Sequence, residues 1–208
     1  MLHRIPFWFQ QIFPGYTWSI ATKNKEIYLT FDDGPVPDVT EWVLSVLDSF
    51  DIKSTFFLVG ENIERHPSIF KKIIADGHSV GNHTYHHLKG WGATTQSYLE
   101  DVEKCSQIIE ANTGSVPTLF RPPHGRIKPL QAKALRNDYQ LIMWNTLTVD
   151  YDRGLAKERC LHNSIKATQP GSIVVFHDSV KAEKNLKYVL PKYIEHFLSE
   201  GYSFKALI

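Results

Sequence analysis

The sequence predicts an α/β fold with parallel strands, arranged either as a (β/α) barrel or as an open, doubly wound sheet. Two observations predict this class: short apolar runs alternate with longer amphipathic stretches along the chain, and the connections between them are short. A third observation is that unusual polar clusters directly follow the apolar runs, where both folds build their active sites. Because the chain has 208 residues, we expect one domain with one core.

The first two strand and helix pairs lie before residue 78. Ile27–Phe31 is strand-like, and Thr55–Val59 is the second apolar run. The second helix is predicted to begin at Pro67, where a missing N–H costs no hydrogen bond, and to end at Gly77. The first helix is predicted from apolar residues at helical spacing, namely Val39, Trp42, Val43, Val46, Leu47 and Phe50.

A short strand at His78–Asn82 precedes the best-marked helix of the sequence. Ser97-x-x-Glu100 is typical of a capping box, which predicts that the helix begins there. Gly114 is its predicted C-terminal stop. The inward stripe is predicted to consist of Leu99, Val102, Ser106 and Ile109.

The second half of the chain completes a set of seven strands. Further strands are predicted at Thr118–Phe120, Gln140–Trp144, Ser172–Phe176 and Tyr202–Leu207. Helices are predicted at about 129–138, 155–167 and 185–198.

Residues 1–25 are predicted to form an N-terminal extension packed on the main domain of residues 26–208. The apolar stretch Ile5–Phe9 is interrupted by Gln10-Gln11 and lacks a small-residue cleavage site, so it is a poor signal peptide. No segment of the sequence is long and apolar enough to span a bilayer. Without a recognisable export signal, we expect a cytoplasmic location.

Composition excludes several classes of function. The net charge is +1 and the basic residues are scattered, so no nucleic-acid partner is expected. Cys105 and Cys160 are the only cysteines, and neither belongs to a Cys-x-x-Cys pair. A disulfide framework and a thiolate metal site are therefore not expected.

Five polar clusters each follow a predicted strand. Any one of them has an ordinary structural explanation, but five that share one face favour a functional site. They are Asp32-Asp33-Gly34, His83–His87, Arg121, Asp150 and His177.

The histidine cluster is a candidate metal site. His83 and His87 are four residues apart and can present two imidazole nitrogens to one ion, although the adjacent His86 could replace His87. Asp33 or Asp32 can supply a carboxylate. One carboxylate would hold the metal, and its neighbour would take a proton from the attacking water.

Two further clusters suit the remaining steps of an acyl hydrolysis. After Arg121, two prolines remove backbone donors, so the N–H of His124 is the first available partner for an oxyanion. His177 emerges from a buried strand and can donate a proton to a leaving group, with Asp150 or Asp152 to orient it. A strand-end histidine can also be satisfied by a backbone carbonyl.

Taken in order, these motifs resemble the polysaccharide deacetylase family, also called carbohydrate esterase family 4, over nearly the whole chain. The matching motifs are Thr30-Phe31-Asp32-Asp33-Gly34, His83-Thr84-x-x-His87, Arg121-x-Pro123-His124, Asp150 and Val175-x-His177.

The resemblance implies a distorted (β/α) barrel of about seven parallel strands and a divalent metal. It implies that Asp32 is the general base, and that the metal ligands are Asp33, His83 and His87. The metal it implies is Zn²⁺, with Co²⁺ or Ni²⁺ as alternatives.

The same resemblance assigns roles to the remaining clusters. Arg121 would steady the base, the backbone N–H of His124 would join the oxyanion hole, and His177 would protonate the leaving amine. Asp150, chosen over Asp152, would tune His177.

Three positions depart from the family pattern. His124 replaces the usual tyrosine, and Val175 replaces a leucine in the pocket for the acetyl methyl. Tyr151 follows Asp150 where the family has tryptophan, which changes the expected wall of the substrate groove.

We therefore expect a metal-dependent hydrolase that removes N-acetyl groups from an amino-sugar glycan, chitin-like or peptidoglycan-like. One alternative is a C–N hydrolase of the same superfamily that acts on a small amide or ureide. Another is a catalytically idle domain that binds carbohydrate, although no catalytic group is missing from the sequence. The sequence leaves the oligomeric state open.

Overall fold

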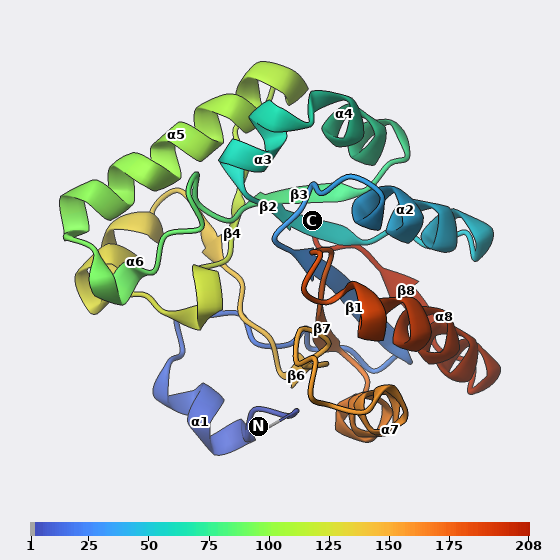
Figure 1. Cartoon of the computed structure of the whole chain (residues 1–208). Coiled ribbons are helices and arrows are strands. Elements are labelled where there is room, and N and C mark those ends of the chain that lie inside the picture. Colours follow the sequence, from blue (N-terminus) through green and yellow to red (C-terminus); the bar gives the residue numbers. More distant parts are fainter. Residues whose placement is uncertain (1–2) are drawn as a thin grey trace.

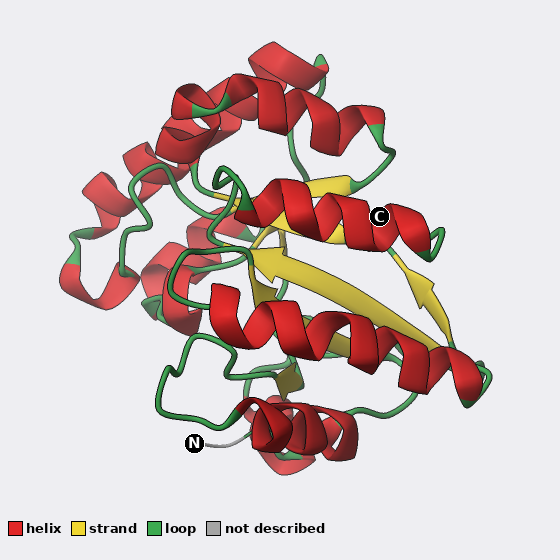
Figure 2. Ribbon diagram, turned by 45° about the vertical axis from the view of Figure 1, so that its right-hand side comes forward, coloured by secondary structure: helices red, strands yellow, loops and turns green. Residues whose placement is uncertain are grey.

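The structure, a computed structural model, describes residues 3–208 as a curled, all-parallel sheet with helices on its outer side (Figures 1 and 2). The strand order is β5-β4-β3-β2-β1-β7-β6, with β8 beside the start of β1. This arrangement confirms the predicted (β/α) barrel. The strands are β1 (Glu26–Asp32), β2 (Thr55–Leu58), β3 (Ser79–Asn82), β4 (Leu119–Phe120), β5 (Gln140–Leu141), β6 (Thr146–Leu147), β7 (Ser172–His177) and β8 (Ser203–Lys205).

Most of the helices lie close to their predicted positions and cover the outside of the sheet (Figure 1), but the helices at Phe7–Ile12 and Gly60–Arg65 were not predicted. The α-helices are α1 (Phe7–Ile12), α2 (Val39–Ser49), α3 (Gly60–Arg65), α4 (Pro67–Ala75), α5 (Thr95–Thr113), α6 (Pro129–Leu135), α7 (Lys157–Ala167) and α8 (Glu183–Ser199), and two short 3₁₀ turns are η1 (Gly90–Gly92) and η2 (Pro123–Gly125).

The predicted start of α5 is wrong by three residues. The helix begins at Thr95, and the side chain of Thr94 accepts a hydrogen bond from the Ser97 N–H, so Thr94 is the N-cap. Ser97 therefore lies in the first turn of the helix and is not its N-cap, although the Ser97-x-x-Glu100 spacing is typical of a capping box. The predicted end is confirmed, because Gly114 adopts φ +75° directly after the helix.

The predicted strand at 140–144 is also wrong in its extent. Pairing with β4 ends at Leu141, and the Met143 N–H donates to the carbonyl of Thr17 instead of to a strand. The chain then pairs again with β7 through Thr146 and Leu147, which form β6. The predicted strand is thus shorter than expected, and strand β6, which follows it at the opposite edge of the sheet, was not predicted.

The N-terminal segment lies along these two edges. Arg4 forms an antiparallel bridge with Thr146, and Thr17 forms a parallel bridge with Ile142. The Ile5 N–H donates to the carbonyl of Asn145. Residues 4–17 therefore cross the open seam of the barrel, which leaves fewer edge groups of β5 and β6 without partners. A domain boundary at residue 25 stays a prediction.

Strand β1 shows how the barrel interior differs from its outer layer. Phe31 points outward and stacks on Phe56 and Phe176, with ring centres 5.0 and 5.9 Å away. Thr30 and Asp32, on the other face of the strand, point inward and contact the side chain of Arg121. The interior at the carboxyl ends of the strands is therefore polar.

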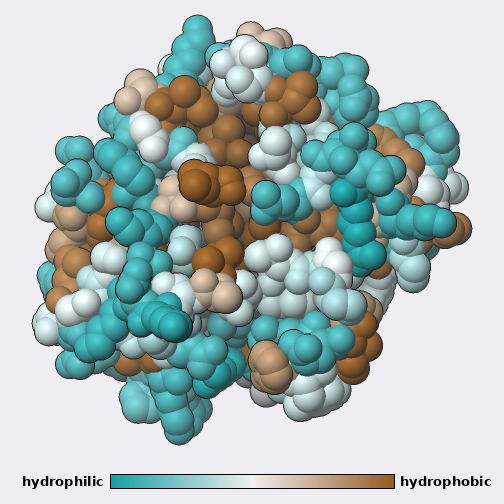
Figure 3. Space-filling model, turned by 180° about the vertical axis from the view of Figure 1, so that it is seen from behind, coloured by the Kyte–Doolittle hydropathy of each residue, from teal (hydrophilic) through white to brown (hydrophobic). Residues whose placement is uncertain are grey.

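The opposite end of the barrel, at the amino ends of the strands, is mainly apolar. Figure 3 shows apolar side chains gathered around a hollow on that side of the molecule, and a cavity of about 260 Å³ lies between β3, β4 and the last two residues. Its lining includes Val80, Val116, Leu119 and Leu207, with no charged or histidine side chain. Acid–base and metal chemistry therefore belongs to the other end.

Candidate metal and catalytic centre

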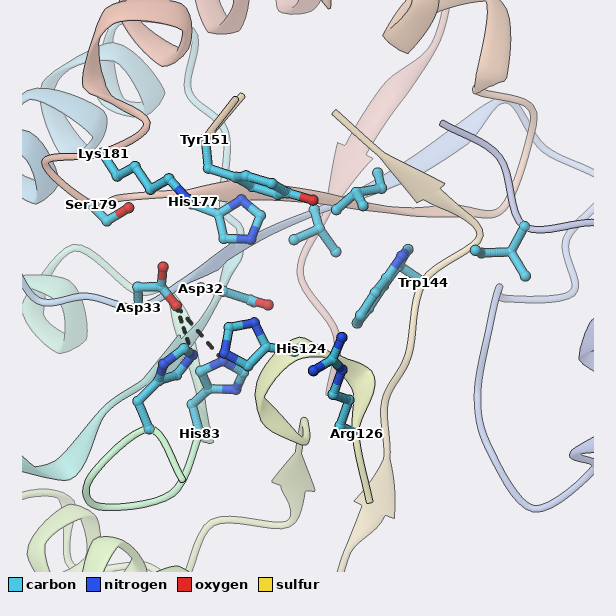
Figure 4. A pocket seen from close by; sticks show the side chains of 14 residues that line it. Asp32, Asp33, His83, His124, Arg126, Trp144, Tyr151, His177, Ser179 and Lys181 are labelled. Carbon is cyan, nitrogen blue, oxygen red and sulfur yellow. Dashed lines mark ion pairs between the residues drawn. The ribbon is translucent and has the colours of Figure 1, made fainter. Parts of the chain in front are cut away.

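A pocket of about 710 Å³ opens at the carboxyl ends of the strands (Figure 4). All five polar clusters predicted from the sequence lie at or directly beneath it. The pocket is lined by Ile5, Asp32, Asp33, His83, His87, His124, Arg126, Trp144, Leu147, Tyr151, Val175, His177, Ser179 and Lys181.

The backbone at this end is unusually strained. Asp33, Thr84, His87, His124 and Val149 have positive φ values between 54° and 84°, a region that residues other than glycine seldom occupy. Each lies in a loop that follows a strand and carries a site residue. Such conformations persist where the surrounding structure enforces them, and they cluster at functional sites.

Asp33 and two histidines form the cluster that can hold a metal ion. The Nε2 atom of His87 is 3.2 Å from Oδ1 of Asp33, and Nε2 of His83 is 3.9 Å from the same oxygen. One ligand atom from each residue lies within 4.8 Å of the other two. Burial opposes ionisation of Asp33, but the hydrogen bond from His87 and the positive charge of the nearby His177 outweigh it and lower its pKa.

His83 is held in the form that suits a metal ligand. Its Nδ1 lies 2.7 Å from the carbonyl oxygen of Arg121, which can only accept, so Nδ1 carries the proton and Nε2 keeps its lone pair. Burial lowers the pKa of His83 to about 4, so the ring is neutral. The donor set, one carboxylate and two imidazoles, therefore fits a late first-row divalent ion.

The structure shows which of the adjacent histidines His86 and His87 belongs to the metal cluster. His86 points away from the cluster, and its Nδ1 lies 2.5 Å from Oδ1 of Asp101 on helix α5. Asp101 also accepts the N–H groups of Tyr85 and His86, so it fixes this loop. Of the two alternatives left open by the sequence, the geometry places His87 beside Asp33.

Asp32 and Arg121 form a buried ion pair next to the cluster. Nη1 of Arg121 donates to Oδ1 of Asp32 over 2.6 Å. The same guanidinium donates to Thr30 Oγ1 and to the carbonyls of Ile142 and Met143, so its position is fixed on three sides. Burial lowers the pKa of Arg121 and the Asp32 charge opposes this. Asp32 is thereby held as an oriented carboxylate.

His177 and Asp150 form a second pair on the far side of the pocket. The Nδ1 atom of His177 lies 2.8 Å from Oδ1 of Asp150, and the His177 backbone N–H donates to Oδ2 over the same distance. Burial lowers the pKa of His177, but Asp150 outweighs it through charge and hydrogen bonding, and the pKa rises to about 9. His177 therefore carries a proton at neutral pH and presents Nε2 to the pocket.

Asp152, the other candidate partner of His177, forms a hydrogen bond within its own loop instead. Its Oδ1 accepts the N–H of Gly154 within the loop. The geometry thus places Asp150 and not Asp152 beside His177.

His124 lies in turn η2, after the two prolines. Its imidazole faces the pocket, with its ring centre 4.8 Å from that of His87. Burial lowers the pKa of His124 to about 4. The sequence assigned a role to its backbone N–H alone, whereas the structure adds a neutral side chain to the pocket lining.

Two aromatic side chains, Tyr151 and Trp144, line the pocket, although Tyr151 stands where the family pattern has tryptophan. Tyr151 stands edge-on to His177, with ring centres 4.8 Å apart and an angle of 87° between the planes. Trp144 faces it across the pocket (Figure 4), and Leu147 and Val175 also line the pocket. Trp144 and Leu147 gave no functional signal in the sequence, because Trp144 is the last residue of the predicted strand Gln140–Trp144 and Leu147 lies just beyond it.

Asp178 is a second residue that sequence reasoning missed. It is fully buried, accepts the Gly34 N–H over 3.1 Å and accepts the Thr40 hydroxyl over 2.5 Å. Burial raises its pKa well above the ordinary range. Because Gly34 follows Asp33, Asp178 anchors the loop that carries the metal-cluster carboxylate. Its position directly after His177 was the available signal.

Comparisons with known proteins agree on one family. The sequence model described as "Polysaccharide deacetylase" matches residues 19–141 of this chain. A peptidoglycan-N-acetylglucosamine deacetylase of Bacillus cereus is 34% identical over 79% of this chain and 60% of its own length. A second one from the same organism is 31% identical over 91% of this chain and 90% of its own length.

The fold comparison gives the same result. The crystal structure of the Bc1960 peptidoglycan N-acetylglucosamine deacetylase superposes with a TM-score of 0.90 at 31% identity, covering 98% of this chain and 95% of that one. The chain spans about 60% of the first of these sequence relatives and nearly the full length of the solved one.

Proposed function

The chain belongs to the polysaccharide deacetylase family, and from this we propose that it hydrolyses N-acetyl groups of an amino-sugar glycan of the peptidoglycan type. Enzymes of this family are metal-dependent, and the two Bacillus cereus relatives are named peptidoglycan-N-acetylglucosamine deacetylases. The observation that carries the proposal is the meeting of three groups in one pocket: the Asp33 cluster, the Asp32–Arg121 pair and the His177–Asp150 pair.

Asp33, His83 and His87 would hold the metal ion, for which we propose Zn²⁺. Imidazole and carboxylate together suit zinc, and cobalt or nickel fits the same donors. When bound, such an ion supplies Lewis acidity that polarises the acetyl carbonyl and favours ionisation of water. The carbonyl of Arg121 keeps the His83 ring in the required tautomer.

Asp32 is the proposed general base. It lines the pocket beside Asp33, yet its Oδ1 is bound to Arg121 and not to a histidine of the cluster. The attacking water gives its proton to this carboxylate. Arg121 holds the carboxylate in place throughout, because three further hydrogen bonds fix the guanidinium itself.

His177 is the proposed general acid. Its Nδ1–H donates to Asp150, so Nε2 carries the proton that can be transferred to the leaving amine. The N–H of His124 is the proposed backbone donor to the developing oxyanion. Tyr151 and Trp144 offer aromatic faces against which a sugar ring can pack.

A substrate panel tests this proposal. Acetate release is measured with N-acetylglucosamine oligomers, with purified peptidoglycan and with a cyclic ureide, each before and after removal of metal by a chelator. We expect acetate from the two glycans, lost on chelation and restored by zinc. Turnover of the ureide alone would support a small-amide hydrolase, and binding of glycans without any acetate release would support an idle domain.

A further inference from the structure

Helix α1 presents an apolar face that no other part of residues 3–208 covers. Phe7 is 72% exposed, Trp8 65% and Ile12 58%, and Phe13 directly after the helix is 39% exposed. The helix buries none of its own residues. In Figure 1 it lies at the margin of the molecule, apart from the ring of helices around the sheet.

This face belongs to a fixed structure and not to a loose end. On the inner side of α1, the Phe9 ring packs against Trp18, with ring centres 5.8 Å apart. Nε2 of Gln10 donates to the carbonyl of Ile5, whose own N–H is bound to Asn145 at the sheet edge. The inner side is therefore anchored, and the apolar residues on the outer side are held toward solvent.

The N-terminal segment that contains the helix carries charge of one sign only. Residues 5–22 contain no charged side chain, and residues 1–25 contain no acidic one. Arg4 precedes the helix, and Arg136 packs on Tyr16 just after it, 4.9 Å from the ring centre. Aromatic and aliphatic residues flanked by cations are typical of helices that lie in the interface of an anionic bilayer.

The exposed area argues for a lipid surface over a second copy of the chain. If a large side chain offers about 200 Å², the four exposed fractions add up to about 470 Å². A stable dimer buries about 800 Å² on each partner. A short helix of six residues cannot supply this area, whereas interfacial insertion of two or three aromatic side chains needs no complementary surface.

We propose that the outer face of α1, with Phe7, Trp8 and Ile12, binds the surface of an anionic lipid bilayer. The helix lies in the interface and does not cross it, in keeping with the absence of any helix among residues 3–208 long and apolar enough to span a membrane. Ile5, two residues before the helix, lines the catalytic pocket. Binding therefore holds the catalytic pocket beside the membrane surface.

Vesicle co-sedimentation of the full chain tests this inference. The vesicles are phosphatidylcholine alone, or an equal mixture of phosphatidylcholine and phosphatidylglycerol. The test variant is Phe7→Ser/Trp8→Ser, and the matched control is Trp91→Ser, which removes a tryptophan that is 61% exposed elsewhere. Circular dichroism and acetate release from soluble oligosaccharides show that the variants are folded and active.

We expect the wild-type chain and Trp91→Ser to bind the mixed vesicles, and the double variant to bind at least about tenfold more weakly. Binding to pure phosphatidylcholine should be weaker, because Arg4 and Arg136 then have no anionic lipid headgroups to interact with. The proposal is wrong if the wild-type chain stays in solution with both vesicles, or if the double variant binds equally well. A dimer in sedimentation velocity that the double variant abolishes would show that a second copy covers this face. These outcomes do not depend on whether the pocket deacetylates.

Discussion

Replacing Asp150 with Asn should move the alkaline limb of the pH profile of kcat/KM to lower pH. Asp150 faces Nδ1 of His177 at 2.8 Å and is the reason that the pKa of His177 is raised to about 9. Relative to the ordinary value of 6.5, this amounts to about 3 kcal/mol in favour of the protonated ring. Asn keeps the size of the side chain and removes the charge.

The expected magnitude follows from the fraction of His177 that is protonated. Without the Asp150 charge, burial lowers the pKa and only the more weakly acting Asp33 and Asp32 raise it, so the variant should have a value close to the ordinary 6.5. A general acid must be protonated, so activity is lost as the pH rises through this pKa. At about pH 8 the protonated fraction falls from about 90% to about 3%, which predicts a loss of about 30-fold, compared with less than about twofold at pH 6.

Acetate release followed from pH 5 to 10 checks this expectation, with Asp152→Asn as the matched control because Asp152 bonds to Gly154 and not to His177. A cation held by Asp33 would offset the part of the rise in the His177 pKa that the Asp33 charge causes, in both proteins alike, so the difference between their alkaline limbs is the quantity to compare. If the limbs of Asp150→Asn and the wild type coincide, His177 is not the acid that Asp150 controls.

Further substitutions at four residues separate the proposed roles. Asp33→Ala should lose metal and regain some activity in excess zinc, whereas Asp32→Asn should keep its metal and stay inactive; the reverse pattern in a metal titration would exchange the two roles. His177→Ala should lower kcat by about 10²- to 10⁴-fold, and near-normal turnover would make this histidine structural. Asp178→Ala leaves the Gly34 N–H and the Thr40 hydroxyl without their acceptor and should lower the free energy of unfolding by about 1–3 kcal/mol. Asp178→Asn keeps one acceptor and should cost less in urea titrations, and equal losses would contradict that account.

The barrel was predictable because its elements differ strongly in period. Strand β7 is a continuous apolar run and α2 repeats at helical spacing, so both are found within about two residues of their predicted ends. Helix α3 was not predicted, because Ile63 is its only large apolar residue and so no periodic stripe exists. The break between β5 and β6 was not predicted either, since the N-terminal segment, distant in sequence, takes the hydrogen bonds.

The site was predictable to the level of its residues but not of their partners. Strand ends identified Asp33, His83 and His177, whereas the choice between His86 and His87 depends on Asp101, which lies on a helix and has no local signal. The neutral tautomer of His83 depends on a carbonyl 38 residues away. Such partners are brought close only by the tertiary structure.

The expected cytoplasmic location stays a prediction.

The central claim is that one metal ion at Asp33, His83 and His87 makes this chain a deacetylase. The most direct measurement is acetate release from N-acetylglucosamine oligomers during titration of metal-free protein with zinc, with bound metal measured by elemental analysis. We predict activity that rises with zinc up to about one ion per chain, and neither metal nor activity in His83→Ala/His87→Ala. Acetate release that is unchanged by metal removal, or a fully loaded chain that releases none, would contradict the account.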